Sequence, residues 1–362
     1  MSILSVDKVQ TTTNSYNIVL SQNFEGLDEC LKDLDSFTSI FIITEKHIAE
    51  LYLLDLEQEL KKQGLSFSTI FMQGREKNKH IRQTGKIYNQ LIEKKADRKS
   101  LIFALGGGVV GDFAGFIAST FLRGIRFIQI PTTLLAAVDS SVGGKVAVNA
   151  DLGKNMIGSF HQPDLVFAPL YTLNSLPTKE WKCGLAEVLK HSLLAGGEFF
   201  EQMKKITRVN YKKIDNIKFY IRESVAYKAS IVSQDPKEKG LRAVLNLGHT
   251  VGHAIESYLQ YKKLTHGEAV SIGLISALLL SEKIFGLTKE IREYVLWIMK
   301  NLSLPYKTDI EPKEILEHMK YDKKNTFGEI HYVLLKELGE PVFGQKINEN
   351  LILEVLSEQQ QI

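Results

Sequence analysis

Apolar residues in the first half of the chain occur in short runs that alternate with helical patterns. Runs rich in β-branched and aromatic residues predict strands at residues 16–20, 39–44, 66–72, 100–105 and 125–130. The periodicity between them predicts helices over residues 48–63 and 81–95. Because strands and helices alternate, we expect a parallel sheet with helices on both faces.

The pattern changes near Pro177. Beyond this residue helical periodicity dominates and β-branched runs are few. The longest apolar run, at residues 269–280, is too short to cross a bilayer and is typical of a buried helix. A chain of 362 residues is also too long for one ordinary core. We therefore expect an α/β domain over residues 1–177 and an all-α domain over residues 178–362.

Composition and charge narrow the class of protein. The hydrophobic content of 44% and the charged content of 24% are those of a globular protein with a sizeable core. The net charge of +3 is small, and acidic and basic residues interleave, which argues against nucleic-acid and membrane partners but suits a small anionic substrate. Cys30 and Cys183 lie far apart, and no secretory signal is visible at the N-terminus. A cytoplasmic location is the expectation.

Histidines gather between residues 246 and 268. His249 and His253 are four residues apart, so on a helix they share a face and could share a metal. Thr250 stands where the helical zinc-protease signature needs Glu, which argues against a metalloprotease. A turn at residues 261–263 could bring His266 back towards the pair. The alternative is a set of surface or core histidines, but their density beside several glycines favours a metal or catalytic site.

A glycine-rich turn follows the strand at residues 100–105. Gly106, Gly108 and Gly111 satisfy G-x-G-x-x-G between a predicted strand and a helix, where backbone N–H groups can bind a phosphate. The turn does not follow the first strand, and no acidic residue stands about 20 residues later, unlike the usual dinucleotide fingerprint. A simple tight turn is the alternative. The context favours a phosphate or dinucleotide site.

Further polar residues follow the next predicted strand. The segment at residues 139–145, DSSVGGK, offers hydroxyls and an ammonium group to phosphate oxygens. Val146 follows Lys145, so the segment is not a Walker A motif. Beyond Pro177, Glu187 lies in an apolar run, where a carboxylate is costly unless it is paired or binds a metal. An ordinary ion pair with Lys190 is the alternative.

These motifs together resemble the 3-dehydroquinate synthase family of sugar phosphate cyclases, in order along nearly the whole chain. The matching segments are GREKNK at 74–79, GGGVVGD at 106–112, RG at 123–124, PTT at 131–133, DSSVGGK at 139–145, GKN at 153–155, TLNSLP at 172–177, GLAEVLK at 184–190, LNLGHTVGHAIE at 245–256, HGEAV at 266–270 and DKKNTFG at 322–328. The resemblance implies a dehydroquinate synthase-like fold, in which a Rossmann-like α/β domain and a helical domain form the active site in a cleft. The C-terminal part beyond Gly344 diverges and is left uninterpreted.

The resemblance also implies site residues. It makes Glu187, His249 and His266 the ligands of Zn²⁺ or Co²⁺, and it gives His253 to the substrate and its protons. The other implied substrate-binding and catalytic residues are Lys145, Asn155, Lys190, Lys228, Arg242, Asn246 and, from the neighbouring subunit of a homodimer, Arg123. The segment Asp322-Lys323-Lys324 is expected near the substrate phosphate.

An NAD site is implied by the same resemblance. Its expected residues are Gly74, Arg75, Glu76, Lys77, Asn78, Lys79, Gly106, Gly107, Gly108, Val109, Val110, Gly111, Asp112, Thr132, Thr133, Asp139, Lys145, Lys154, Thr172, Leu173, Asn174 and Ser175.

The implied reaction converts 3-deoxy-D-arabino-heptulosonate 7-phosphate to 3-dehydroquinate and phosphate. It combines transient oxidation by NAD, β-elimination of phosphate, re-reduction and an intramolecular aldol closure. One alternative is a sister cyclase that makes an inosose or a valiolone, against which Arg242 argues. Others are a net polyol dehydrogenase and a catalytically silent binding protein. The intact Glu187, His249, His266 and Lys190 argue against the silent protein.

Overall fold

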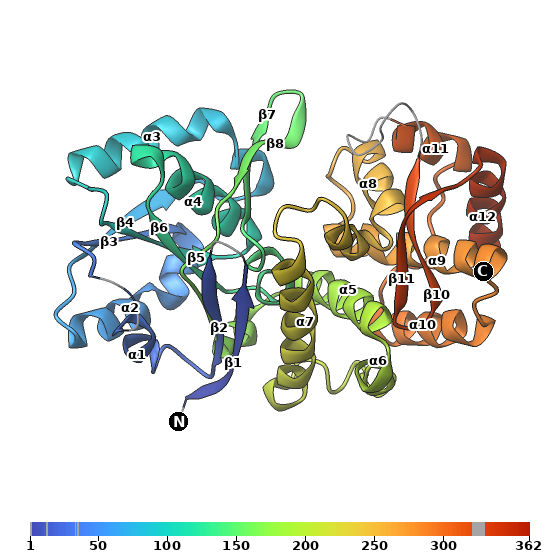
Figure 1. The fold of residues 1–362 in the computed structure, drawn as a ribbon, viewed down its shortest axis with the longest axis horizontal. Coiled ribbons are helices and arrows are strands. Elements are labelled where there is room, and N and C mark those ends of the chain that lie inside the picture. Colours follow the sequence, from blue (N-terminus) through green and yellow to red (C-terminus); the bar gives the residue numbers. More distant parts are fainter. Residues whose placement is uncertain (1, 12–13, 33, 35, 321–329) are drawn as a thin grey trace. The chain divides into compact units, whose positions relative to one another are not determined.

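The chain forms two compact units in the computed structural model, which describes residues 2–11, 14–32, 34, 36–320 and 330–362 (Figure 1). Unit 1 comprises Met1–Leu176 and Ala229–Lys237, and unit 2 comprises Pro177–Lys228 and Glu238–Ile362. The sequence pattern does not predict that residues 229–237 belong to unit 1.

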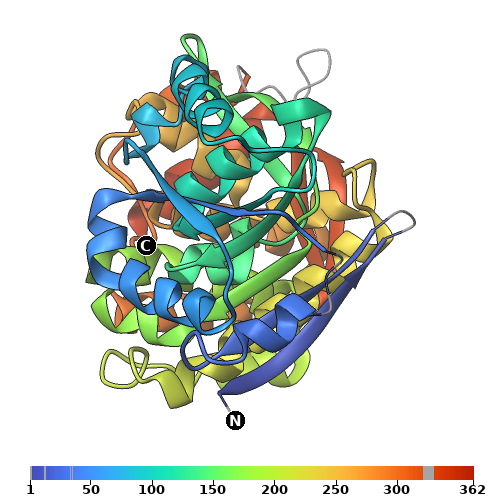
Figure 2. The same ribbon diagram turned by 90° about the vertical axis from the view of Figure 1, so that its left-hand side faces the viewer.

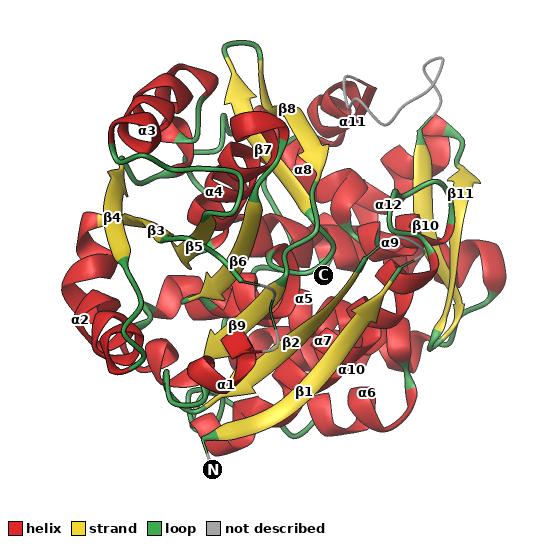
Figure 3. Cartoon of the chain, turned by 60° about the vertical axis from the view of Figure 1, so that its left-hand side comes forward, coloured by secondary structure: helices red, strands yellow, loops and turns green. Residues whose placement is uncertain are grey.

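A seven-stranded sheet forms the centre of unit 1, with the strand order β1-β2-β9-β6-β5-β3-β4 (Figure 3). All neighbouring strands are parallel except β1, which pairs antiparallel with β2 at the rim of the sheet (Figure 2). The strands are β1 (Ile3–Gln10), β2 (Ser15–Ser21), β3 (Ile40–Glu45), β4 (Phe67–Met72), β5 (Leu101–Gly106), β6 (Arg126–Pro131) and β9 (Leu165–Pro169). The predicted strands are confirmed to within one or two residues, whereas β1 and β9 were not predicted.

Helices cover both faces of this sheet, as expected for a parallel sheet. Alternate residues of β3 point to opposite faces, so Phe41 and Ile43 belong to one apolar cluster and Ile40 and Ile42 to the other. The first cluster is completed by α3 (Ile81–Glu93) and α4 (Gly108–Thr120). The second is completed by α1 (Leu27–Lys32) and α2 (Lys46–Lys62). The predicted helices are α2 and α3.

Short elements and one hairpin occupy the loops of unit 1. The hairpin pairs β7 with β8 antiparallel. The elements are η1 (Glu76–Asn78), η2 (Phe121–Arg123), the π-helical turn η3 (Ala136–Ser140), β7 (Lys145–Ala150), β8 (Gly153–Phe160) and η4 (Leu170–Ser175). These loops carry most of the polar motifs of the first half of the chain.

Unit 2 is built mainly of helices, which confirms the predicted fold class of an α/β part followed by a helical part. Its helices are α5 (Thr178–Ala195), α6 (Gly197–Met203), α7 (Ile214–Gln234, in unit 2 as far as Lys228), η5 (Leu241–Asn246), α8 (His249–Tyr258), α9 (His266–Phe285), α10 (Lys289–Leu302), α11 (Pro312–Lys320) and α12 (Glu349–Gln361). Helix α9 is the predicted buried helix, with residues 269–281 all buried. None of the described helices combines the length and the apolarity needed to cross a bilayer.

Unit 2 is not purely helical, which corrects the all-α expectation in one detail. The strands β10 (His331–Glu337) and β11 (Glu340–Lys346) form an antiparallel hairpin. Tyr332 to Leu335 are buried, and α9 packs against β10. The apolar run before Leu338-Gly339 is a strand-turn signal, and Gly339 adopts φ +85° in the turn.

Two helical glycines of unit 1 give opposite expectations for stability. A methyl group on Gly115 of α4 would lie 2.4 Å from Val146 Cγ1, whereas one on Gly85 of α3 would meet no atom within 4 Å. We expect Gly115→Ala to lower the free energy of unfolding by about 1–3 kcal/mol through overpacking. The matched control, Gly85→Ala, should raise it by about 0.5–1 kcal/mol. Denaturant unfolding followed by circular dichroism measures both, and a stabilised Gly115→Ala would contradict this packing.

Candidate functional site

Three helices of unit 2, α5, α8 and α9, pack closely at positions occupied by glycine. A methyl group on Gly267 of α9 would lie 2.2 Å from the carbonyl oxygen of Cys183 in α5. A methyl group on Gly273 would lie 1.9 Å from the carbonyl oxygen of Gly248, which precedes α8. Any side chain at Gly267 or Gly273 would push the helices apart. The glycines beside the histidines therefore let side chains of three helices meet.

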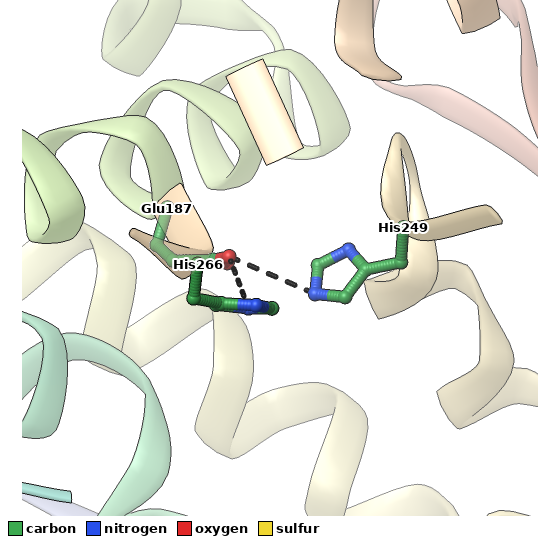
Figure 4. A group of neighbouring side chains, drawn as sticks. All are labelled: Glu187, His249 and His266. Atoms are coloured by element: carbon green, nitrogen blue, oxygen red, sulfur yellow. Dashed lines mark ion pairs between the residues drawn. The ribbon is translucent and has the colours of Figure 1, made fainter. Parts of the chain in front are cut away.

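Glu187 of α5, His249 of α8 and His266 of α9 converge at this junction (Figure 4). Glu187 Oε1 lies 3.7 Å from Nε2 of His249 and 3.5 Å from Nε2 of His266. One ligand atom of each residue lies within 4.8 Å of the others. Helical spacing alone pairs His249 with His253, but no group of converging ligand atoms among the described residues contains both.

The ring of His249 is held in one tautomer. Its Nδ1 donates a hydrogen bond to the carbonyl oxygen of Leu247 at 3.1 Å. Burial, aided by the charge of Lys190, holds the pKa of His249 well below its usual range, so the ring is neutral. A neutral ring with its proton on Nδ1 has a lone pair on Nε2. That lone pair faces a carboxylate oxygen, and two such acceptors side by side attract a cation.

His266 is the first residue of α9, where a capping box fixes the backbone. Thr265 Oγ1 accepts a hydrogen bond from the N–H of Glu268, and the Glu268 carboxylate accepts one from the N–H of Thr265. The ring Nδ1 lies 3.0 Å from Oε2 of Glu256. Burial would lower the pKa of His266, but the carboxylates of Glu187 and Glu256 raise it to about 10. The imidazole thus has a carboxylate at each nitrogen.

Glu187 forms an ion pair with Lys190, and both side chains are buried on α5. Burial alone would raise the pKa of Glu187, but the charge of Lys190, together with the neighbouring imidazoles of His249 and His266, holds it well below its usual range. The ion pair that was the alternative to a metal is therefore present. It engages only Oε2, and Oε1, which faces both histidines, has no hydrogen-bond partner among the described residues.

The donors at this junction fit a divalent cation. One ionised carboxylate and two imidazole nitrogens are a common set for catalytic Zn²⁺, which keeps a further position open. Cobalt accepts similar ligands. Such an ion would satisfy Oε1 of Glu187 and the lone pair of His249.

His253 lies beside the three ligand candidates without joining them. Its ring centroid is 5.3 Å from that of His249 and 5.9 Å from that of His266. A second group of converging atoms, formed by His253, Glu256 and His266, offers an alternative cation position. This second group includes the carboxylate of Glu256, which already lies at Nδ1 of His266.

A cavity of about 190 Å³ adjoins these residues in unit 2. His249, His253 and Asn246 line one part of it, and the β10–β11 hairpin supplies His331, Tyr332, Val333, Phe343 and Gly344. Thr250 donates a hydrogen bond to the carbonyl oxygen of His331 and so ties α8 to the hairpin. These hairpin residues were not predicted from the sequence, because the second half of the chain was expected to be helical.

The cations expected to bind substrate are buried in unit 2. Arg242, on η5, is 2% exposed, and Lys228, on α7, is 6% exposed. Asn246, at the end of η5, donates hydrogen bonds to Glu238 Oε1 at 3.0 Å and to the carbonyl oxygen of Ala243 at 3.1 Å. Buried cations of this kind require anionic or polar partners.

The glycine-rich turn of unit 1 leads from β5 directly into α4. Gly107 precedes the helix, and no described side chain caps its N-terminus. A methyl group on Gly106 would lie 2.5 Å from Val110 Cγ2, and one on Gly111 would lie 2.6 Å from Gln129 Oε1. These glycines thus permit close packing of the turn, while the first N–H groups of α4 are suited to an anion.

Buried hydroxyl groups lie next to this turn. Thr132 follows β6, and its N–H donates to the carbonyl oxygen of Gly106 at 2.9 Å. The hydroxyls of Thr132 and Ser141 are buried without a hydrogen-bond partner among the described residues. Thr133 caps the N–H of Ala136 at the start of η3. Unsatisfied buried hydroxyls are groups that a bound phosphate or ribose would satisfy.

Lys79, Asp112 and Asn155, which come from three separate motifs, form one network. Lys79 Nζ lies 2.6 Å from Asp112 Oδ2 and 2.7 Å from Asn155 Oδ1. Lys79 is 2% exposed, and although burial would lower its pKa, Asp112 and Glu76 raise it. Asn155 has φ +53°, and its N–H donates to Asn149 Oδ1. The network fixes the β7–β8 hairpin to α4 and η1.

The other predicted residues of unit 1 lie on its loops and short elements, in the β7–β8 hairpin or in the first turn of α4. Thr172 and Ser175 of η4 contact the hydroxyl of Tyr52, which donates to the Thr172 carbonyl oxygen at 2.8 Å. Leu173 is buried, and Asn174 is exposed. Arg75 and Arg123 are exposed with positive φ angles of 73° and 71°. Gly74, Lys77, Asn78, Gly108, Val109, Asp139, Lys145 and Lys154 are part-buried or exposed. The segment Asp322-Lys323-Lys324 lies outside the described residues.

Comparison with known proteins places the chain in one family. The family described as 3-dehydroquinate synthase N-terminal matches residues 69–183, and 3-dehydroquinate synthase C-terminal matches residues 184–325. A 3-dehydroquinate synthase of Leptospira interrogans is 56% identical over 98% of both chains. The chain belongs to the 3-dehydroquinate synthase family. A member from Desulforamulus reducens is 44% identical over 97% of this chain and 99% of its own.

Solved structures of sister enzymes share the family fold. A 2-deoxy-scyllo-inosose synthase, complexed with carbaglucose-6-phosphate, NAD⁺ and Co²⁺, has a TM-score of 0.87 at 25% identity and covers 98% of this chain and 99% of its own. A 2-epi-5-epi-valiolone synthase from Streptomyces hygroscopicus, with NAD⁺ and Zn²⁺ bound, has a TM-score of 0.87 at 24% identity over 96% of this chain and 97% of its own. The latter likeness concerns the fold alone.

Proposed function

We propose that the chain catalyses the reaction of its family, the conversion of 3-deoxy-D-arabino-heptulosonate 7-phosphate to 3-dehydroquinate and phosphate. The steps are transient oxidation, β-elimination of phosphate, re-reduction and intramolecular aldol closure, as part of the shikimate pathway to aromatic amino acids. The observation that carries the proposal is the convergence of Glu187, His249 and His266, with a bare His249 Nε2 facing a buried carboxylate oxygen.

Glu187, His249 and His266 hold Zn²⁺ or Co²⁺ in this proposal. When bound, the ion supplies Lewis acidity that makes a substrate hydroxyl easier to deprotonate and oxidise. His253 keeps its ring beside the ligands and handles a substrate proton. Lys190 neutralises Glu187 and offers its remaining N–H groups to the substrate.

Cationic and amide side chains bind the anionic substrate in this proposal. Arg242, Lys228 and Asn246 hold its carboxylate and hydroxyls, since guanidinium and ammonium groups are the usual partners of carboxylates. Lys145 and Asn155 also serve the substrate. Arg123 acts in the site of a neighbouring subunit in a homodimer, and its left-handed backbone conformation supports such a special role. The enzyme is cytoplasmic in this proposal.

NAD is bound by the loops of unit 1. When bound, it accepts and returns a hydride, so the cofactor is recycled without net redox change. The uncapped N-terminus of α4 would suit the pyrophosphate, and the buried hydroxyl of Thr132 would be free to hydrogen-bond the nucleotide. Lys79, Asp112 and Asn155 hold the surrounding loops in place through their shared network. In this proposal unit 1 binds NAD and unit 2 holds the metal.

A sister cyclase activity is the second candidate, because two solved structures with this fold are an inosose synthase and a valiolone synthase. The identity to the sister enzymes is 24–25%, whereas the curated 3-dehydroquinate synthases reach 56%. The substrate carboxylate separates the two activities, and the buried Arg242 favours the carboxylate.

Phosphate release tests the reaction itself. We expect the protein, supplied with NAD⁺ and Zn²⁺, to release phosphate from the heptulosonate phosphate while absorbance at the NADH band stays flat, because the hydride is returned in each turnover. A phosphate assay and a spectrophotometer measure both. Steady accumulation of NADH would contradict the proposal and indicate a dehydrogenase. Turnover of a hexose phosphate in its place would indicate the sister cyclase.

Substitutions separate the metal ligands from the substrate group. His249→Ala and Glu187→Gln should reduce bound zinc from about one ion per chain to near zero, since each removes one of three ligands. His253→Ala should keep the zinc and lose about 100-fold or more in kcat. The matched control is His318→Ala on α11. His318 Nδ1 lies 3.0 Å from Ser257 Oγ, and the residue belongs to no converging ligand group among the described residues, so this variant should keep both the zinc and the activity. Metal analysis of dialysed protein decides, and loss of zinc in His253→Ala would make His253 a ligand.

A further inference from the structure

Glu256 is a buried carboxylate on the same face of α8 as two functional histidines. It follows His249 by seven residues and His253 by three, a spacing that aligns side chains along one helix face. The residue is 5% exposed. Its Oε2 atom lies 3.0 Å from Nδ1 of His266, on the next helix. The residues assigned above to metal, substrate and NAD do not include it.

The contact with Glu256 determines which ring nitrogen of His266 faces Glu187. A carboxylate accepts, so the Nδ1–H of His266 donates to Glu256. With Nδ1 engaged, Nε2 is the nitrogen directed at Glu187 Oε1, 3.5 Å away. Turning the ring over would place a carbon atom against the Glu256 carboxylate and would lose this hydrogen bond.

The two histidines are thus oriented by different acceptors. His249 donates its Nδ1–H to the backbone carbonyl of Leu247, whereas His266 donates to a charged side chain. A hydrogen bond from an imidazole to a carboxylate makes the other ring nitrogen a stronger ligand. The backbone of His266 is already fixed by the capping box at Thr265, so ring rotation is the remaining freedom.

We propose that Glu256 is a positioning residue, which orients the imidazole of His266 and strengthens its Nε2 as a ligand. The proposal rests on the metal site of the proposed function. It makes Glu256 a partner of the ligand and not a ligand, although Glu256 also converges with His253 and His266. The distance of 3.0 Å from Nδ1 is that of a hydrogen bond and leaves that nitrogen no lone pair for an ion.

Metal affinity of the full-length protein tests this role directly. Chelator-treated protein is titrated with Zn²⁺ in competition with a chromophoric chelator, and with Co²⁺ while its visible absorption is recorded. We expect Glu256→Ala to weaken Zn²⁺ binding by about 10–100-fold and to shift the Co²⁺ bands. Glu256→Gln should weaken it less, because an amide oxygen still accepts from Nδ1–H.

The matched control is Glu282→Gln on α9. Glu282 is also a nearly buried carboxylate, and it accepts hydrogen bonds from Arg292 far along the helix from His266. The Glu282→Gln protein should bind both ions as the unsubstituted protein does, with the same Co²⁺ spectrum. The control thus separates the loss of the Glu256 contact from the general effect of removing a nearly buried carboxylate.

Other outcomes would contradict either the positioning role or the proposed function. Unchanged Zn²⁺ affinity and Co²⁺ spectrum in Glu256→Ala would overturn the positioning role. Complete loss of bound metal, equal to that in Glu187→Gln, would make Glu256 a ligand and would overturn it too. If Glu256→Ala fails to fold by circular dichroism, Glu256→Gln is judged by the same criteria. Absence of metal binding in the unsubstituted protein would instead contradict the proposed function.

Discussion

The close approach of α5, α8 and α9 is the constraint on which unit 2 depends. Glycine at positions 267 and 273 allows backbone to lie against backbone, and a methyl group at either would fall within about 2.2 Å of a carbonyl oxygen. Only this approach lets a carboxylate buried on α5 meet imidazoles from two other helices. Burying ionised Glu187 costs free energy that Lys190 offsets in part. A divalent ion would offset the remainder, so the metal site depends on the close packing of these helices.

The loops of unit 1 also combine tight packing with polar groups that a ligand would satisfy. There the sheet is regular, and the polar residues lie where its strands end, as in other open α/β sheets. Lys79, Asp112 and Asn155 bind one another and hold three loops together. Thr132 and the first turn of α4 keep groups that a nucleotide would satisfy. Rigid loops with a few unsatisfied groups are suited to holding a cofactor through a reaction of several steps.

Much of this arrangement was predictable from the sequence. The continuous apolar runs at residues 39–44 and 100–105 predicted buried strands, and the density of histidines marked the site. Local spacing failed where partners are distant: it paired His249 with His253, whereas helix packing brings His266 and Glu187 together. The hairpin at residues 331–346 was missed because a short strand in a helical region has a weak signal. Glu256 was missed because its role depends on a contact between two helices.

In the proposed site Glu187, His249 and His266 hold one divalent cation, while His253 and Glu256 do not. Anomalous scattering from crystals grown with Zn²⁺ would locate this ion. We expect a single zinc peak in unit 2, about 2.0–2.2 Å from a Glu187 oxygen and from Nε2 of both histidines. A zinc peak bound by His253 or by Glu256, with His249 left out, would contradict it.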